Sequence, residues 1–414
     1  MSGDALVSRR RALGYGGVAA GGLVVGGVSG AAIASAEEPA PAPAPSATTV
    51  PFRGRHQAGI ATPAQDRLLF ASFDLTTDAR SDVEGLLREW TIAAERMTQG
   101  HLVTDTEDDA AAPPADTGEA VGLHPAALTL TFGLGPTFFD RVGLGDRRPA
   151  ALVDLPAFPG DNLDPARSGG DLCVQACGND PQVLFHAIRN LARIGRGIVR
   201  IRWTQEGFGR TSSTTTSQST PRNLMGFKDG TDNLKADTEE FAPNIWARRS
   251  DGAAWMDGGS YLVARRIRIR IEVWDRSSLA DQEATIGRVR STGAPLGMAD
   301  EFAKIDLDAT AADGTPVVPV DAHVRLANQD RLGIHILRRG YNFTDGLDPR
   351  VGQLDAGLFF LAFQRDPRTQ FIPMQQKLAE SDALNEYIQH VGSAVFAVLP
   401  GVTAGHWLGE TLFA

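Results

Sequence analysis

Cysteine is scarce in this sequence: among 414 residues only Cys173 and Cys177 occur. If their segment is a strand, the spacing of four places both side chains on one face but about 13 Å apart, at about 3.3 Å per residue. That separation is too long for a disulfide bond. We therefore expect two buried free thiols rather than a disulfide-stapled fold.

Several common site motifs are also missing. The eight histidines never occur as HxH or HExxH, and the two cysteines do not form CxxC, so no zinc site is indicated. A GxGxxG loop after a strand, a Walker loop and a GxSxG turn are absent as well. Dinucleotide-binding, nucleotide-hydrolysing and serine-hydrolase functions therefore lack support.

Basic residues are outnumbered by acidic ones, 40 to 50, which gives a formal net charge of −10. An acidic protein is a poor partner for nucleic acid or for an anionic membrane surface. We expect neither partner.

The N-terminus combines three consecutive arginines at 9–11, a charge-free and glycine-rich stretch at 12–36, and the small-x-small sequence Ala34-Ser35-Ala36. This pattern is typical of a twin-arginine export signal covering residues 1–36, with cleavage after Ala36. The alternative is a transmembrane anchor: its length allows a span, but the glycine content argues against one. We expect an exported protein that is secreted, periplasmic or associated with the cell envelope, without a stable membrane span after cleavage. Residues 37–50 alternate proline with alanine and predict a linker.

The remaining chain predicts two similar halves that each mix strands and helices, at 51–210 and 224–414, joined by a Ser/Thr-rich linker at 211–223. The first half has predicted strands at 68–74, 127–132, 171–176 and 198–203, and helices at 78–97 and 181–194. The second half has predicted strands at 261–274, 334–338 and 358–363, and helices at 278–289, 373–378 and 384–390. An α+β fold with a crevice between the halves follows, and crevices between domains often hold cofactors.

The decapeptide at 224–233 places a single acid, Asp229, between Gly226 and Gly230. Glycine lets the backbone approach a flat ligand closely and adopt φ values that other residues avoid. A carboxylate fixed in such a loop can move protons to and from a substrate. Taken alone, the same pattern also describes a surface turn with a solvated aspartate.

The rest of the chain resembles the dye-decolourising peroxidases, and specifically their exported, twin-arginine subgroup. The matching segments are Phe52–Pro63, Gly226–Thr231, Asp321–Arg325, Ile336–Tyr341, Gly357–Phe360 and Asp382–Ile388. The resemblance implies two ferredoxin-like domains with antiparallel sheets, and haem in the C-terminal half near the crevice between the domains. It implies one haem b per chain, hydrogen peroxide as oxidant, and bulky organic electron donors such as dyes and phenolics.

The resemblance also implies roles for three residues. His323 is the axial iron ligand, Asp229 is the distal acid–base group, and Arg338 is the distal cation. In such a site one carboxylate can take a proton from peroxide and return it to the leaving oxygen, while a fixed guanidinium stabilises the developing charge. The expected product is a ferryl intermediate formed with Asp229 and Arg338.

Neighbouring residues complete the predicted site. The ring N–H of His323 needs an acceptor, and Glu386 is the candidate, with Asp382 in reserve. Period two in the strand containing Arg338 places His335 and Arg339 on the opposite face, so His335, the rival ligand, is expected to be structural and Arg339 to meet solvent or a carboxylate. The other expected cofactor contacts are Gly230, Thr231, Asp232, Asn328 and Phe360. The arginine face of strand 261–274 fits either a solvated sheet face or a clamp for the haem propionates.

Two other functions stay open. One is an exported haem-handling protein that releases iron from haem, like a deferrochelatase, together with iron-uptake partner proteins. The other is a non-enzymatic carrier, against which the presence of both Asp229 and Arg338 argues, because a carrier needs no acid–base pair. The sequence also leaves a homo-oligomer open.

Overall fold

The strands of this protein run antiparallel to their neighbours and join in one sheet. The structure is a computed structural model that describes residues 48–105 and 109–414. The predicted signal at 1–36 and nearly all of the linker at 37–50 lie outside the described residues. The described strands are β1 (Arg67–Leu75), β2 (Thr129–Leu134), β3 (Leu172–Gly178), β4 (Val199–Arg210), β5 (Ser260–Ile269), β6 (Leu337–Arg338), β7 (Tyr341–Asp348), β8 (Gln353–Gln364) and β9 (Ile388–Val398).

The order of these strands brings the two halves of the chain together. It runs β5-β9-β2-β3-β1-β4-β7-β8-β6, and β5 also pairs with β8, so the described sheet closes on itself. The halves meet where β2 pairs with β9, through Gly133 and Val398, and where β4 pairs with β7, through Phe208 and Asn342. The expected antiparallel α+β architecture is confirmed. Hydrogen bonds across both junctions join the described strands of the two halves into one sheet.

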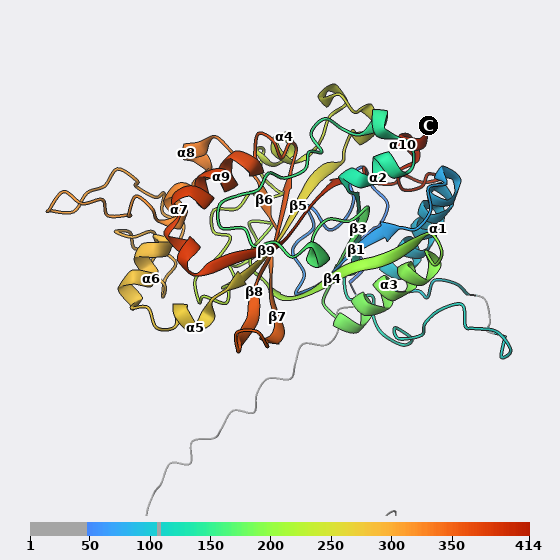
Figure 1. Ribbon diagram of the computed structural model, residues 1–414, viewed down its shortest axis with the longest axis horizontal. Coiled ribbons are helices and arrows are strands. Elements are labelled where there is room, and N and C mark those ends of the chain that lie inside the picture. The colour runs from blue at the N-terminus through green and yellow to red at the C-terminus, as the bar shows by residue number, and fades with distance from the viewer. Residues whose placement is uncertain (1–47, 106–108) are drawn as a thin grey trace, which may run out of the picture. The chain divides into compact units, whose positions relative to one another are not determined.

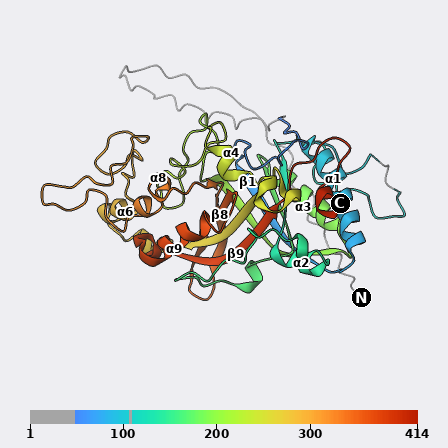
Figure 2. The ribbon, with the colours of Figure 1, turned by 90° about the horizontal axis from the view of Figure 1, so that it is seen from above.

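Helices cover the sheet at two separate places (Figures 1 and 2). Both views show α1 and α3 at one end of the sheet, and α6, α8 and α9 at the other. The described α-helices are α1 (Arg80–Thr98), α2 (Pro136–Arg141), α3 (Pro181–Ile194), α4 (Phe241–Ile245), α5 (Ile271–Trp274), α6 (Leu279–Ile286), α7 (His323–Leu326), α8 (Gln329–Leu332), α9 (Phe371–Ser381) and α10 (Glu410–Phe413). Among the described residues, none of these helices is both long and apolar enough to cross a membrane.

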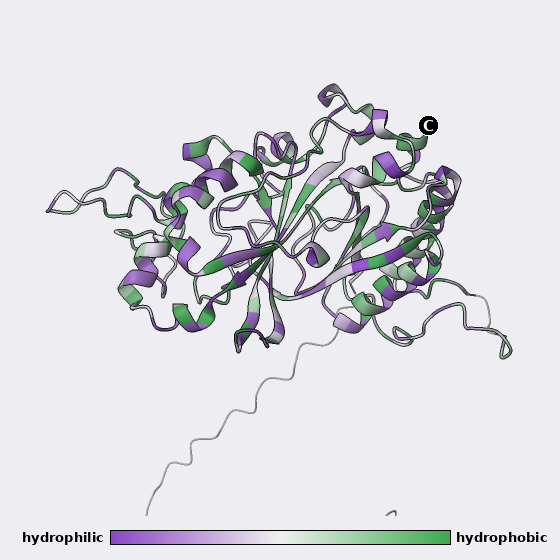
Figure 3. Cartoon of the chain, in the orientation of Figure 1, coloured by the Kyte–Doolittle hydropathy of each residue, from purple (hydrophilic) through white to green (hydrophobic). Residues whose placement is uncertain are grey.

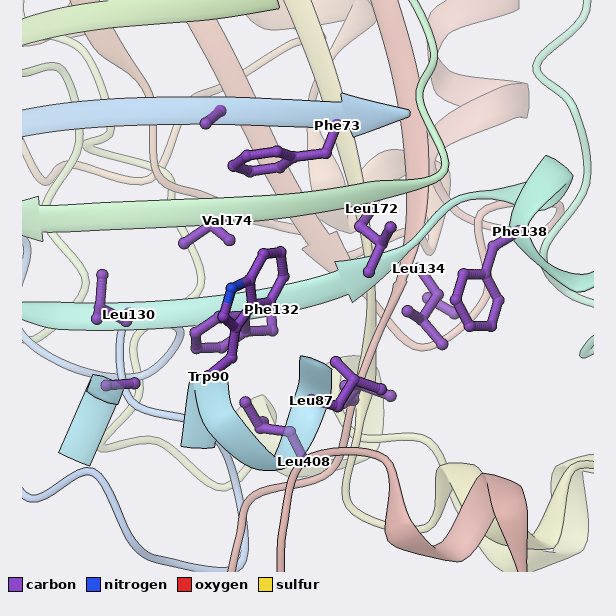
Figure 4. Close-up of a cluster of buried hydrophobic side chains, with 14 of the residues drawn as sticks. Phe73, Leu87, Trp90, Leu130, Phe132, Leu134, Phe138, Leu172, Val174 and Leu408 are labelled. Atoms are coloured by element: carbon purple, nitrogen blue, oxygen red, sulfur yellow. The ribbon is translucent and has the colours of Figure 1, made fainter. Parts of the chain in front are cut away.

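The first half has a filled interior. Helix α3 begins at Pro181, where the Asp180 side chain accepts hydrogen bonds from the next backbone N–H groups. Its apolar face packs on the sheet beside α1, and Trp90 of α1 lies tilted against Phe132 of β2 with ring centroids 5.7 Å apart. Figure 4 shows these rings among leucine and phenylalanine side chains of β1, β2 and β3. In Figure 3 green and purple alternate along β4, and from Trp203 to Gly207 every second residue is buried.

Three predicted elements of the second half need correction. Of the predicted strand 334–338, only Leu337–Arg338 forms a strand, β6. The predicted strand 261–274 ends as β5 at Ile269, and Ile271–Trp274 forms the helical turn α5. The predicted helix 384–390 is a short 3₁₀ turn, Ala383–Glu386, followed by strand β9. The two thiols are buried and unpaired in β3, as expected from their spacing.

Candidate active site

A cavity of about 320 Å³ lies within the second half, with walls formed by residues between Asn223 and His390. Its size falls within the range of about 300–1,000 Å³ that is usual for small-molecule and cofactor sites. Much of the wall is apolar, and its large apolar side chains include Ile267, Ile269, Leu358, Phe360, Phe371 and Met374. A few charged groups converge on this apolar space, as in most ligand sites.

Asp229 and Arg338 form an ion pair on one side of the cavity. Arg338 Nη1 donates to Asp229 Oδ1 at 2.7 Å, and Asn223 Nδ2 donates to Asp229 Oδ2 at 3.2 Å. Gly230 follows with φ +83°, and a Cβ at this position would lie 2.7 Å from Ser212 Cα. Only glycine therefore fits behind the carboxylate without strain.

The backbone of Arg338 is held as firmly as its side chain. Its N–H donates to Asn233 Oδ1 at 2.8 Å, and its carbonyl accepts from Asn233 Nδ2 at 2.9 Å and from the Ser212 hydroxyl at 2.8 Å. The same loop that carries Asp229 thus fixes the strand that carries Arg338. The two side chains are pre-positioned as a unit.

His323 lies on the same cavity at the first position of α7. Its Nδ1 is 2.6 Å from Asp382 Oδ2, which leaves Nε2 as the ring nitrogen that is open to a ligand. Burial alone lowers the pKa of His323, but the Asp382 carboxylate outweighs burial and the net pKa is raised. A ring fixed and made more basic in this way is typical of a metal-binding histidine.

The acceptor for His323 is therefore Asp382, and the prediction of Glu386 is wrong. Asp382 is buried at the end of α9, where its Oδ1 also accepts from Leu384 N at 2.8 Å. Glu386 lies four residues further, at the exposed end of the 3₁₀ turn, and does not line the cavity. The backbone turn that Asp382 caps is what directs its second oxygen to the imidazole.

The other predicted contacts gather around the same cavity. Its lining includes Gly230, Thr231, Asp232, Asn328 and Phe360. Their roles toward a cofactor stay predictions.

The residues expected on the opposite face of the Arg338 strand stay out of the cavity lining. His335 is half-buried there, and its carbonyl accepts from Gln370. Arg339 is fully buried, where it donates to the Thr62 carbonyl and to Gln65 Oε1. The expectation of solvent or a carboxylate for Arg339 is wrong, because its guanidinium is buried against a carbonyl and an amide oxygen of the first half.

Two arginines that were not predicted to belong to the site, one in β5 and one in the loop after α6, place positive charge on the cavity. Arg266 and Arg268 bind Asp345, Asp355 and Asp348 and do not line the cavity, whereas Arg270 is exposed to solvent. Arg265, on the alternate face, lines the cavity instead.

Arg288 also lines the cavity, although only 8 % of its surface is exposed. Burial lowers its pKa, and Asp232 and Glu301 partly offset that effect. Its Nη1 donates to the backbone carbonyls of Gly293 and Glu301. No motif in the sequence marked Arg288, which is a cation available to an acidic group in the cavity.

Comparison with known proteins matches both halves of the chain. Residues 57–209 match the N-terminal Dyp-type peroxidase model, and residues 220–403 match the C-terminal one. A dye-decolorizing peroxidase of Thermobifida fusca is 41% identical over 368 residues, covering 86% of this chain and 83% of that protein. A deferrochelatase of Yersinia pestis is 37% identical over 420 residues, covering 98% of this chain and 94% of that protein.

Solved structures agree with the sequence matches. Ferric DtpA of Streptomyces lividans superposes with a TM-score of 0.82 at 40% identity, covering 89% of this chain and 98% of that chain. A DyP-type peroxidase of Cellulomonas bogoriensis gives 0.80 at 40% identity, covering 89% and 99%. This chain therefore belongs to the DyP-type peroxidase family.

Proposed function

We propose that the protein binds one haem b in this cavity and uses hydrogen peroxide to oxidise bulky organic donors such as dyes and phenolics. The observation that carries the proposal is the meeting of two pairs, His323 with Asp382 and Asp229 with Arg338, on one largely apolar cavity. The family supports the peroxidase activity, and the relative in Thermobifida fusca is named for dye decolourisation.

The cavity suits haem by its chemistry. His323 Nε2 would hold the iron, the apolar wall that includes Phe360 would pack on the macrocycle, and Arg288 would meet a propionate. Gly230, Thr231, Asp232 and Asn328 would line its edge. Bound haem supplies a redox-active iron with one coordination position left for peroxide.

The chain's own residues supply proton transfer and charge. Arg338 holds Oδ1 of Asp229 at 2.7 Å, whereas the contact of Oδ2 with Asn223 is longer, at 3.2 Å. Oδ2 is therefore the oxygen that would take a proton from peroxide and return it to the departing oxygen. Arg338 would stabilise negative charge as the O–O bond breaks.

A second candidate function is release of iron from haem. Its support is the group of deferrochelatase relatives, one of which matches nearly the whole chain. The ion pair of Asp229 and Arg338 favours the peroxidase over iron release, because cleavage of peroxide needs a proton carrier and a fixed positive charge. Incubation of the haem-loaded protein with an iron chelator separates the two: free porphyrin would indicate deferrochelatase chemistry, and intact haem would indicate the peroxidase.

We also propose export by the twin-arginine route, on the sequence of residues 9–36. Localisation and iron-uptake partners are tested together by fractionating cells that produce the full chain. Substitution of Arg9 and Arg10 by lysine should leave the protein inside the cell. Unchanged export of that variant would argue against the route.

Peroxide-dependent turnover of an anthraquinone dye by the haem-loaded protein tests the main proposal. Arg338→Leu should keep haem but slow the reaction with peroxide by about 10²–10³, the usual cost of removing one such donor. Arg189→Leu, on the surface of α3, is the matched control. A lack of dye oxidation by wild type, or equal rates in wild type and Arg338→Leu, would contradict the proposal.

A further inference from the structure

The segment between α6 and α7 contributes one wall of the cavity. It forms the long orange loop beside these helices in Figure 1. Residues 301–305 line the cavity, and along 301–307 every second residue, 302, 304 and 306, is exposed while the others are half-buried. The segment begins with a turn at 301–303, continues without regular secondary structure through 304–306, and keeps one side against the body. We call residues 301–307 the cavity strap.

One end of the cavity strap is tied to the loop that carries Asp229. The Glu301 carboxylate forms an ion pair with Lys228 Nζ and accepts from Thr231 Oγ1 at 3.1 Å. Its backbone carbonyl accepts from Arg288 Nη1 at 3.1 Å. The Glu301 side chain is only 10% exposed, so solvent weakens this tie less than it would a surface pair.

The other end is tied to the helix that carries His323. Arg325 Nη2 donates to the Leu307 carbonyl at 2.5 Å and to the Val318 carbonyl at 2.8 Å. Between the two ties, no hydrogen bond from residues 304–306 to the rest of the described protein is found, apart from the turn that Asp306 forms with its own neighbours. Two ties thus hold the whole segment.

The remaining walls are much harder to open. Strands β5 and β8 pair over eight residue positions, and β5 pairs with β9 over ten. Moving either strand would break a ladder of backbone hydrogen bonds, whereas lifting the cavity strap breaks only its end contacts.

We propose that the cavity strap closes the cavity over the bound haem, and that Glu301 and Arg325 act as positioning residues whose ties set the rate at which haem leaves. The proposal rests on the proposed function, since it requires haem in this cavity. It would let one site either retain its cofactor or give it up, depending on the strength of two polar contacts.

Transfer of haem to excess apomyoglobin measures this rate directly. Glu301→Gln removes the negative charge that pairs with Lys228, and Arg325→Leu removes the hydrogen bonds of the guanidinium. Each should speed the loss of haem roughly tenfold or more. Glu84→Gln and Arg350→Leu are the controls, because each removes one charge from an ion pair outside the cavity. Both controls should release haem at the wild-type rate.

Two further measurements separate the strap from general loosening. Backbone amides of residues 303–306 should exchange hydrogen faster in both tie variants, while the melting temperature of each haem-free variant stays near that of wild type. Unchanged haem loss in both tie variants would overturn the strap and leave the proposed function standing. Equal acceleration in the controls would also overturn it. A wild-type protein that takes up no haem would instead overturn the proposed function.

Discussion

The two halves of the molecule use the same kinds of elements but treat their interiors differently. In the first half, Trp90 of α1 and its apolar neighbours pack against β2, and aromatic rings fill the interior between helices and sheet (Figure 4). In the second half, Phe360 and Phe371 also contact each other, with centroids 6.1 Å apart, but both line an open cavity. The candidate site thus lies in the half whose interior is incompletely packed, where polar side chains surround the cavity.

The largest effect expected in the second half, which contains the cavity, comes from His323→Ala. Without the imidazole, the iron loses its protein ligand, so haem should not bind in its normal coordination. Haem content and the visible spectrum measure this. His335→Ala is the control and should keep the wild-type spectrum. The reverse pattern, with haem lost only from His335→Ala, would show that the ligand is assigned to the wrong histidine.

Equivalent substitutions in the two halves should have unequal costs. Phe132→Ala in the filled half should lower the free energy of unfolding by about 3–5 kcal/mol, as is usual for a buried phenylalanine. Phe360→Ala should cost the haem-free protein less than half as much, because its ring already borders open space. Urea unfolding of both variants gives the comparison, and equal losses would mean that the second half is packed as tightly as the first.

A smaller effect, on haem affinity, distinguishes Asp382 from Glu386 as the hydrogen-bond acceptor of His323. Asp382→Asn should weaken haem binding by about 10–100-fold, because the imidazole loses the charged acceptor that orients it and raises its basicity. Glu386→Gln should bind haem like wild type, since this side chain is exposed and outside the cavity. Titration of each haem-free variant with haem measures both affinities. A larger loss in Glu386→Gln would restore the prediction made from the sequence.

The smallest expected effect is on acid stability. Burial and the nearby Arg265 lower the pKa of His390 to about 3, although Asp161 lies 3.9 Å from its ring. The unfolded chain takes up this proton near the ordinary value of 6.5, so the stability contributed by His390 is lost as pH falls from 6.5 toward 3. Between pH 6.5 and 5.5 the free energy of unfolding should drop by about 1 kcal/mol more in wild type than in His390→Gln. Exposed His101→Gln is the control, and parallel curves for wild type and His390→Gln would refute the effect.

Elements that are determined by interactions between residues close in the sequence were predicted correctly. Helix α3 was predicted with its observed bounds, because Asp180, Pro181 and a regular apolar face are all local signals. Asp229, His323 and Arg338 were brought to one cavity as the resemblance implied.

The predictions that the structure corrects concern residues whose conformation depends on contacts with distant parts of the chain. Strand β9 was predicted as helical in its first residues, since its pairing with β5, over 100 positions earlier, leaves no local pattern. Asp382 was ranked below Glu386 because the capped turn that directs its oxygen exists only after folding. Arg288 carried no signal, since its place depends on backbone carbonyls that it meets in three dimensions.

The position of β9 in the sheet has a consequence for synthesis of the chain. This strand lies between β5 and β2, yet in chain order it is the last of the described strands, Ile388–Val398. Until it leaves the ribosome, both neighbours would present unpaired edges, which are templates for aggregation. The sheet therefore cannot be completed before β9 is available, and a protein truncated before Ile388 should be recovered as aggregates rather than as a smaller folded domain.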